Sequence, residues 1–148
     1  MWSPYFSEKT STLINAIHNK GIKKVNLVPD FTESGKIRIT EDQLELINKS
    51  ADCELKRMPA MANEIYRLVH AKVWLTKDKI GVGSWNFSKG ATGLIIPQNI
   101  RNIEAGIVSS INNKECLELL SKLKPLNNSK ELASTVEELD KEKELINK

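Results

Sequence analysis

His70 and Lys72 are the two residues whose types and spacing best suit chemistry on an anion. They lie in residues 66–76, where small and β-branched residues alternate with them, and this pattern predicts a strand. Two residues apart on a strand, their side chains share a face at a spacing of about 7 Å. A neutral imidazole can attack while an ammonium neutralises charge. The pair therefore suits an electrophile with anionic oxygens.

Ser84 and Asn86 form a second polar pair shortly afterwards. Residues 79–82 predict another strand, and Gly83 permits a tight turn at its end. Ser84 and Asn86 again have the same parity, so both can donate hydrogen bonds to one phosphate group. A His and a Lys on a strand are by themselves more often structural than catalytic. The nearby Gly-Ser-Trp-Asn segment favours the catalytic interpretation.

Together, His70-Ala71-Lys72 and Gly83-Ser84-Trp85-Asn86 resemble the HxK…GSxN signature of the phospholipase D superfamily. The resemblance is close from His70 to Asn86 and loose over residues 1–124. It implies that His70 attacks phosphorus to give a phosphohistidine, while Lys72, Ser84 and Asn86 hold the non-bridging oxygens. It implies no metal and no other cofactor.

Two acidic residues complete the set of candidate catalytic residues. The stretch 102–106 resembles the family's later segment with an acidic residue, so Glu104 would orient the catalytic histidine. The family places an Asp five residues after the lysine, but Lys77 occupies that position here and the spacing to Gly83 is one residue short. A turn shifted by one residue would let Asp78 substitute; otherwise the role of this Asp is lost.

The family's reaction needs a second histidine, from a second copy of the motif, to protonate the leaving oxygen. This sequence holds one copy, and His18 lacks the accompanying Lys and Gly-Ser-x-Asn residues. A twofold axis would bring two copies of one motif face to face. We therefore expect a homodimer, or a second motif-bearing half. The start at residues 1–6 is similar to the exit of a strand, which suggests a piece of a longer protein.

The charge and the apolar content of the sequence limit the classes of partner that we expect. Residues 1–124 hold 18 Lys/Arg and 13 Asp/Glu, a charge of +5, whereas residues 125–148 hold 4 and 6, a charge of −2. A basic body suits nucleic acid, DNA above all, although enzymes of anionic metabolites are also basic. No apolar run reaches membrane-spanning length and no export signal is present, so we expect a cytoplasmic protein without a membrane partner. Cys53 and Cys116 suit buried free thiols.

These residues must be positioned by the surrounding helices and strands. The alternation of expected helices and strands along the sequence predicts an α/β fold with a mixed, mostly parallel sheet flanked by helices. We expect a helix over residues 10–20 with Leu13, Ile14 and Ile17 inward, and strands over 23–28 and 53–58. A surface loop is expected over 30–36. Thr40 precedes a capping box and a helix whose inward residues are Leu44, Leu46 and Ile47.

The predicted organisation is a phospholipase D-like domain over residues 1–124, followed by a charged helical extension over 125–148. The predicted function is a phosphodiesterase, most concretely a metal-independent nuclease that acts through a phosphohistidine. Two alternatives stay open. One is a phospholipase; the other is a non-catalytic phospholipase D-like module for nucleic-acid binding or dimerisation within a multidomain DNA-processing protein.

Overall fold

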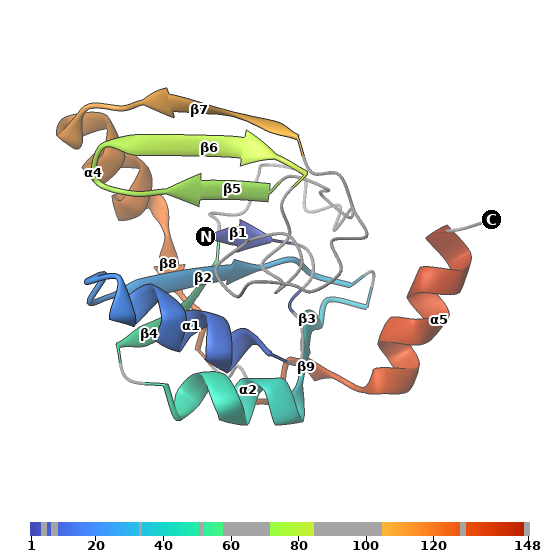
Figure 1. Cartoon of the computed structure of the whole chain (residues 1–148). Coiled ribbons are helices and arrows are strands. Elements are labelled where there is room, and N and C mark those ends of the chain that lie inside the picture. The colour runs from blue at the N-terminus through green and yellow to red at the C-terminus, as the bar shows by residue number, and fades with distance from the viewer. Residues whose placement is uncertain are drawn as a thin grey trace.

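A computed structural model describes residues 1–3, 6, 9–32, 34–50, 52–57, 72–84, 105–127 and 130–146. These residues form one large sheet, a small two-stranded sheet and four helices (Figure 1). The large sheet has the order β7-β6-β5-β1-β2-β4-β8. Its strands are β1 Trp2–Ser3, β2 Val25–Pro29, β4 Cys53–Arg57, β5 Lys72–Leu75, β6 Lys79–Gly83, β7 Gly106–Ser110 and β8 Lys124–Pro125. The small sheet pairs β3 Ile37–Thr40 with β9 Ala133–Ser134, and the helices are α1 Thr10–Asn19, α2 Glu41–Asn48, α4 Asn113–Lys122 and α5 Val136–Ile146.

The large sheet is mixed, and helices flank it, as the predicted α/β class requires. Its parallel pairs lie in the middle, where β2 pairs with both β1 and β4. The other described pairings of this sheet are antiparallel: β1 with β5, β5 with β6, β6 with β7, and β4 with β8. The chain therefore combines crossover connections through α1 and α2 with an antiparallel meander over β5, β6 and β7.

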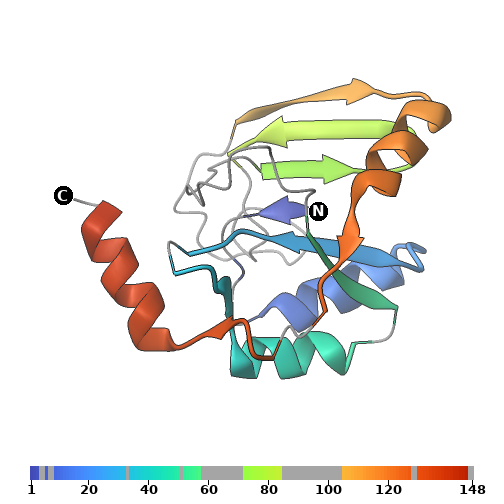
Figure 2. The same cartoon turned by 180° about the vertical axis from the view of Figure 1, so that it is seen from behind.

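Helix α1 follows from the apolar stripe of its sequence. Leu13, Ile14 and Ile17 are buried, as expected. The helix covers the lower part of the sheet together with α2 (Figures 1 and 2). The helix ends before Gly21, whose φ of +86° is a left-handed conformation that glycine adopts without steric cost. The predicted helix over residues 10–20 is thus confirmed.

Helix α2 begins at the predicted capping box. The Thr40 hydroxyl accepts from the Gln43 N–H at 3.3 Å, and the Gln43 side chain accepts from the Thr40 N–H at 3.0 Å. Leu44 and Ile47 are buried as expected, but the inward placement of Leu46 is wrong, because 41% of it is exposed. Leu46 lies two positions after Leu44, and a helical pitch of 3.6 residues turns it away from the core.

Residues 30–36 differ from the predicted surface loop. Gly35, with φ +79°, forms the expected turn, but Asp30 and Thr32 are buried. The Thr32 hydroxyl accepts from the Lys36 N–H at 3.0 Å, which closes the turn. Arg38 N–H donates to the Asp30 carbonyl at 2.9 Å and continues this hairpin into β3. Local side-chain bonds of this kind let a polar segment pack inside the body.

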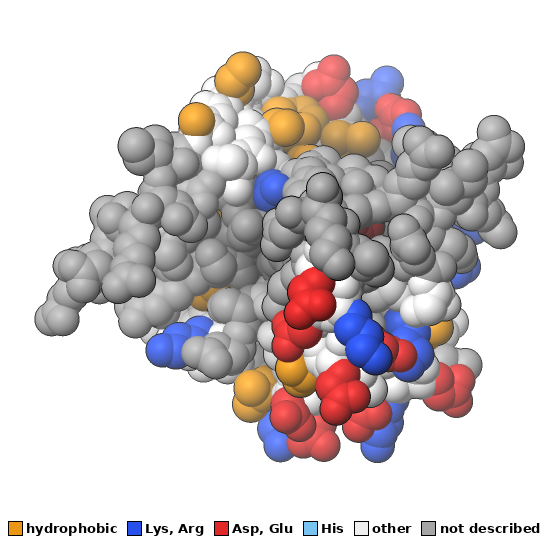
Figure 3. Space-filling view, turned by 90° about the vertical axis from the view of Figure 1, so that its right-hand side faces the viewer, with side chains coloured by type: hydrophobic (Ala, Val, Ile, Leu, Met, Phe, Trp, Pro, Cys, Tyr) orange, Lys and Arg blue, Asp and Glu red, His pale blue; other side chains and the backbone are white. Residues whose placement is uncertain are grey.

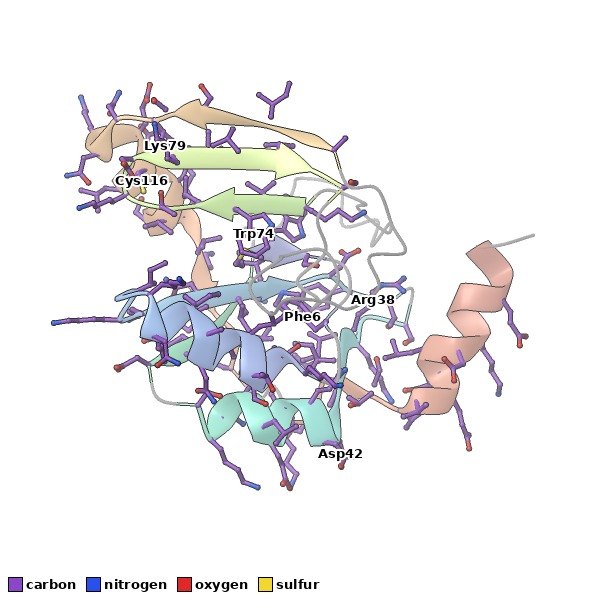
Figure 4. The ribbon with its side chains drawn as sticks, viewed as in Figure 1. Phe6, Arg38, Asp42, Trp74, Lys79 and Cys116 are labelled. Atoms are coloured by element: carbon purple, nitrogen blue, oxygen red, sulfur yellow. The ribbon has the colours of Figure 1, made fainter. Side chains whose placement is uncertain are left out.

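The core lies between the sheet and the two helices α1 and α2. Trp74 packs against it from β5 (Figure 4). Cys116 is buried beside the turn that joins β5 to β6, where its Sγ donates to the Thr76 carbonyl at 3.1 Å. The buried cluster contains Phe6, Leu13, Ile14, Ile17, Val25, Leu27, Ile37, Ile39, Leu44, Ile47, Leu126 and Ala133.

The segment after residue 123 is partly built into the body. Strand β8 pairs with β4, Leu126 joins the core, and the buried Ser134 hydroxyl donates to the Ile37 carbonyl at 2.7 Å. Helix α5 extends from the body and is tethered by Lys36 to Glu138 at 2.8 Å (Figure 1). Figure 3 faces the side of α5 and shows acidic and basic side chains interspersed, as on a solvated face. The division into residues 1–124 and 125–148 stays a prediction.

Candidate active site

The β5–β6 hairpin brings two of the predicted site residues together. Its register pairs Lys72 with Gly83, Val73 with Val82 and Leu75 with Ile80. Ser84 follows Gly83 directly, so Lys72 and Ser84 lie at the same end of this hairpin. Neighbouring strands are about 4.8 Å apart. The hairpin therefore supplies a cation and a hydroxyl that can approach one small anion.

Lys72 lies in a sheltered position at this end of the sheet. It is 8% exposed, and no hydrogen bond or ion pair joins its ammonium to a described residue. On one side it faces Gly83, which has no side chain; on the other, the β1–β5 register of Trp2 with Val73 places Ser3 opposite it. Burying an ammonium is costly unless an anion accompanies it. Lys72 is therefore well suited to neutralise a bound anionic oxygen.

Ser84 is held by the chain that enters β7. Its hydroxyl accepts from the Ala105 N–H at 2.9 Å and donates to the Ala105 carbonyl at 3.3 Å. Its own N–H donates to the same carbonyl at 2.9 Å. A hydroxyl has one proton and two lone pairs, so Ser84 can keep the bond that it accepts while turning its proton to a ligand. This arrangement gives an oriented donor at the exit of β6.

A buried charged pair lies at the same end of the sheet, where β2 leads into β3. Arg38 and Asp30 are 4% and 7% exposed, with 4.0 Å between Nε and Oδ2, and the Arg38 Nε–H also donates to the Phe31 carbonyl at 3.4 Å. Pro29, just before Asp30, pairs with Ser3, the neighbour of Lys72 (Figure 4 shows Arg38). Sequence reasoning missed this pair, because one Arg in a β-branched strand gives no motif.

Comparison with known proteins gives a structural likeness. NucT from Helicobacter pylori, a nuclease of the phospholipase D superfamily, matches with a TM-score of 0.50 over 84% of this chain and 79% of that chain. The fold is phospholipase D-like. Sequence identity is 14%, so this likeness concerns the fold alone. No family model matches the chain, and no curated protein matches it.

Three predicted site residues, His70, Asn86 and Glu104, lie outside the described residues. Each is close in sequence to a described residue of the candidate site: His70 is two residues before Lys72, Asn86 two after Ser84, and Glu104 immediately before Ala105. Lys72, Ser84 and Ala105 lie at one end of three neighbouring strands of the phospholipase D-like sheet.

Asp78 is not at this end of the sheet. It lies in the turn between β5 and β6, where the Thr76 hydroxyl donates to its carboxylate at 3.1 Å. Thr76 is four positions after Lys72, a length of about 13 Å along a strand. Lys79, the next residue, appears at the far end of the hairpin from Arg38 (Figure 4). The hairpin does not bring Asp78 to Lys72 and Ser84.

His18, the other histidine of the sequence, is among the described residues. It lies in the last turn of α1, partly buried, and its Nε2 has no hydrogen-bond partner among the described residues.

None of the described helices is long and apolar enough to cross a membrane.

Proposed function

We propose that this chain is a phosphodiesterase, and most concretely a nuclease that cleaves through a phosphohistidine without a metal. The observation that carries the proposal is the hairpin that sets the sheltered Lys72 opposite Gly83 and beside Ser84 within a phospholipase D-like fold. A buried ammonium with an oriented hydroxyl beside it suits the two non-bridging oxygens of a phosphodiester.

In the proposed reaction, an imidazole nitrogen of His70 attacks phosphorus as the bond from phosphorus to the leaving oxygen breaks. Lys72, Ser84 and Asn86 neutralise or hydrogen-bond the non-bridging oxygens, and Glu104 orients His70. A general acid protonates the leaving oxygen, and water then attacks phosphorus and releases His70. That acid would come from a second copy in a homodimer or from a second motif-bearing half.

Nucleic acid is the proposed substrate, with DNA ahead of RNA. Residues 1–124 carry a charge of +5, which favours a polyanion over a neutral lipid surface. None of the described helices could span a membrane. A cytoplasmic location belongs to the same proposal, and a phospholipase is the alternative within the enzyme class.

A second candidate function is a non-catalytic phospholipase D-like module that binds nucleic acid or dimerises within a multidomain DNA-processing protein. Its support is the place of Asp78, at the end of the hairpin opposite Lys72, together with Lys77 at the position where the family has Asp. Asp78, the acidic residue of the described hairpin, thus lies at its turn and not at the end that holds Lys72 and Ser84.

The test measures hydrolysis of bis(p-nitrophenyl) phosphate and of single- and double-stranded DNA in EDTA, with the mass in solution recorded alongside. Wild type is compared with His70→Ala and Lys72→Met, and Lys79→Met serves as a matched control because Lys79 lies at the other end of the hairpin, bonded to Ser110 at 2.9 Å. We expect turnover by wild type and Lys79→Met only. DNA binding without turnover in every protein would favour the non-catalytic module.

A further inference from the structure

Strand β7 forms one edge of the large sheet. All five of its residues, Gly106–Ser110, are exposed, and its described strand neighbour is β6 alone. The pairing with β6 is regular over all five positions, without a bulge. Natural proteins protect an edge strand from pairing by placing charged side chains or proline on it, and β7 has neither. Among the described strands, β7 is therefore a long and unprotected edge.

The hydrogen-bond register shows which backbone groups face outward. Ser84 N–H donates to the Ala105 carbonyl and Ile111 N–H donates to the Asp78 carbonyl, and each bond joins residues that lie directly opposite. Antiparallel partners alternate between bonded and non-bonded pairs. The odd-numbered residues of β7 therefore bond to β6, whereas Gly106, Val108 and Ser110 direct their N–H and C=O groups to the open edge.

The side chains of β7 are apolar on both faces of the sheet. Ile107 is 76% exposed and lies opposite the half-exposed Val82, whereas Val108 is 64% exposed on the other face. Hydrophobic side chains gather at the top of Figure 3, the level at which β7 lies in Figure 1. A strand added to this edge would shelter apolar surface on both faces.

We propose that β7 pairs antiparallel with β7 of a second copy about a twofold axis at Val108. Val108 then faces Val108 of the other copy, and Gly106 faces Ser110, so the outward N–H and C=O groups of all three residues find partners. Small residues meet small ones at both ends. The other described edge of the large sheet, β8, has two residues, one of them Pro125, and cannot supply this partner.

Charge also favours a second copy at this place. The chain carries a net charge of +3, so two copies repel each other, and they do so least where uncharged surfaces meet. The side chains of β7 are themselves uncharged, and the Lys79 ammonium contacts the strand at its last residue, 2.9 Å from the Ser110 hydroxyl. One strand pair buries less than the roughly 1,200 Å² of a standard stable interface. We therefore expect a dimer that dissociates on dilution.

The pairing does not depend on the proposed function. In each copy Lys72 lies at the Gly106 end of β7. Because the paired β7 strands run antiparallel, the Lys72 residues of the two copies then lie at opposite ends of the joined sheet. It therefore leaves each candidate site open and differs from a dimer in which two motifs face each other. Phosphodiester turnover and β7 pairing can be lost separately.

The first test is a disulfide cross-link in the full chain, with copper phenanthroline as the oxidant of two thiols. Val108→Cys should give a covalent dimer, since bonded antiparallel partners have Cα atoms about 5.5 Å apart, within disulfide range. Ile107→Cys is the matched control, because its counterpart lies about 8 Å away across the axis, beyond disulfide range. Wild type controls for Cys53 and Cys116. Equal cross-linking of both variants, or of neither, would overturn the proposed register.

The second test is the mass in solution over a wide range of protein concentration. Val108→Glu places two carboxylates opposite each other and should abolish the dimer, while Val82→Glu, a change at another exposed valine one strand inward, should keep it. Circular dichroism checks that both variants fold. A monomeric wild type at every concentration, or a Val108→Glu protein that still dimerises, would overturn the proposal.

Discussion

The Ser84 hydroxyl and the main chain of Ala105 bond in both directions, at 2.9 and 3.3 Å. This contact joins residues 21 positions apart, at the point where β6 ends and the chain approaches β7. Ala105 directly follows Glu104, and Ser84 precedes Asn86 by two residues. Ser84 thus links the two segments that hold the predicted acidic residue and the predicted amide, besides offering its own proton.

We predict that Ser84→Ala lowers kcat toward a diester by about a hundredfold, the usual effect of removing one donor to developing negative charge. Ser84→Thr keeps the hydroxyl and should retain most of the activity. The measurement is kcat and KM for both variants, with urea unfolding to check stability. Ser84→Ala also removes the two bonds of the hydroxyl to Ala105, and at an exposed position the loss of such bonds costs about 1 kcal/mol of stability. Equal losses of kcat in both variants would argue for a steric cause.

Asp78 gives a second prediction, on the departure from the family motif. Its carboxylate lies in the β5–β6 turn, bonded to Thr76 and remote from Lys72. Asp78→Asn should therefore leave kcat and KM close to those of wild type, because its field at the site is weakened by distance and solvent. A large loss of kcat, with unfolding unchanged, would show that this carboxylate does act at the site.

The sequence predicted best those elements whose signals are local. The apolar stripe of α1 and the capping box of α2 depend on residues within one or two turns, and both helices form as expected. The alternation over residues 66–76 and the strand expected over 79–82 are local signals too, and the described residues of both stretches form β5 and β6.

What the sequence did not show depends on distant contacts. Ser134 bonds to Ile37 across 97 residues, and Leu126 enters a core built mainly from residues 6–47. Arg38 and Asp30 become a buried pair because β2 and β3 turn back on each other. No periodicity in a window of a dozen residues records such pairings. The position of Asp78 along the chain likewise did not reveal that it lies in the turn of the hairpin, at the opposite end from Lys72 and Ser84.

The buried pair of Arg38 and Asp30 gives a prediction on stability. Replacing Arg38 by Met leaves the Asp30 carboxylate buried beside an apolar side chain, and the loss of one partner of a buried pair costs about 3 kcal/mol. Urea unfolding measures the change. Arg57→Met is the matched control, since Arg57 is exposed on β4 and its loss should be nearly neutral. Similar effects of the two changes would contradict the role assigned to Arg38.

Glu54 gives a prediction on acid stability. Its carboxylate accepts hydrogen bonds from the ammonium groups of Lys24 and Lys56, each at 2.6 Å. These two bonds lower the pKa of the Glu54 carboxyl to about 2, and the bond from Lys24 is the larger cause. A lowered folded pKa stabilises the fold above the unfolded value of 4.5, and this contribution is lost as pH falls from there toward 2. The unfolding free energy of wild type should therefore fall more steeply over this range than that of Glu54→Gln.

The control for Glu54 is its partner Lys24. In a Lys24→Gln background the change in slope that Glu54→Gln causes should shrink, because the larger of the two causes is gone. Added salt should shrink it too, since both partners are partly exposed. Identical slopes for wild type and Glu54→Gln at low salt would contradict the assignment.

Cys53 gives a prediction on reactivity. Burial raises the pKa of its thiol from 9.0 to about 11. Because the thiolate is the reactive form, Cys53 should react slowly with Ellman's reagent in the folded protein at pH 8 and faster as pH rises toward 11. A raised folded pKa also means that this thiol favours folding below pH 9 and ceases to do so as pH rises through 11.

The second thiol, Cys116, must be distinguished from Cys53 in this measurement. Cys116 is buried and bonded to the Thr76 carbonyl, so it should be slow as well. Urea should release both thiols, and the single variants Cys53→Ser and Cys116→Ser assign them. One fast thiol at pH 8 in the folded Cys116→Ser protein would show that Cys53 is not sheltered.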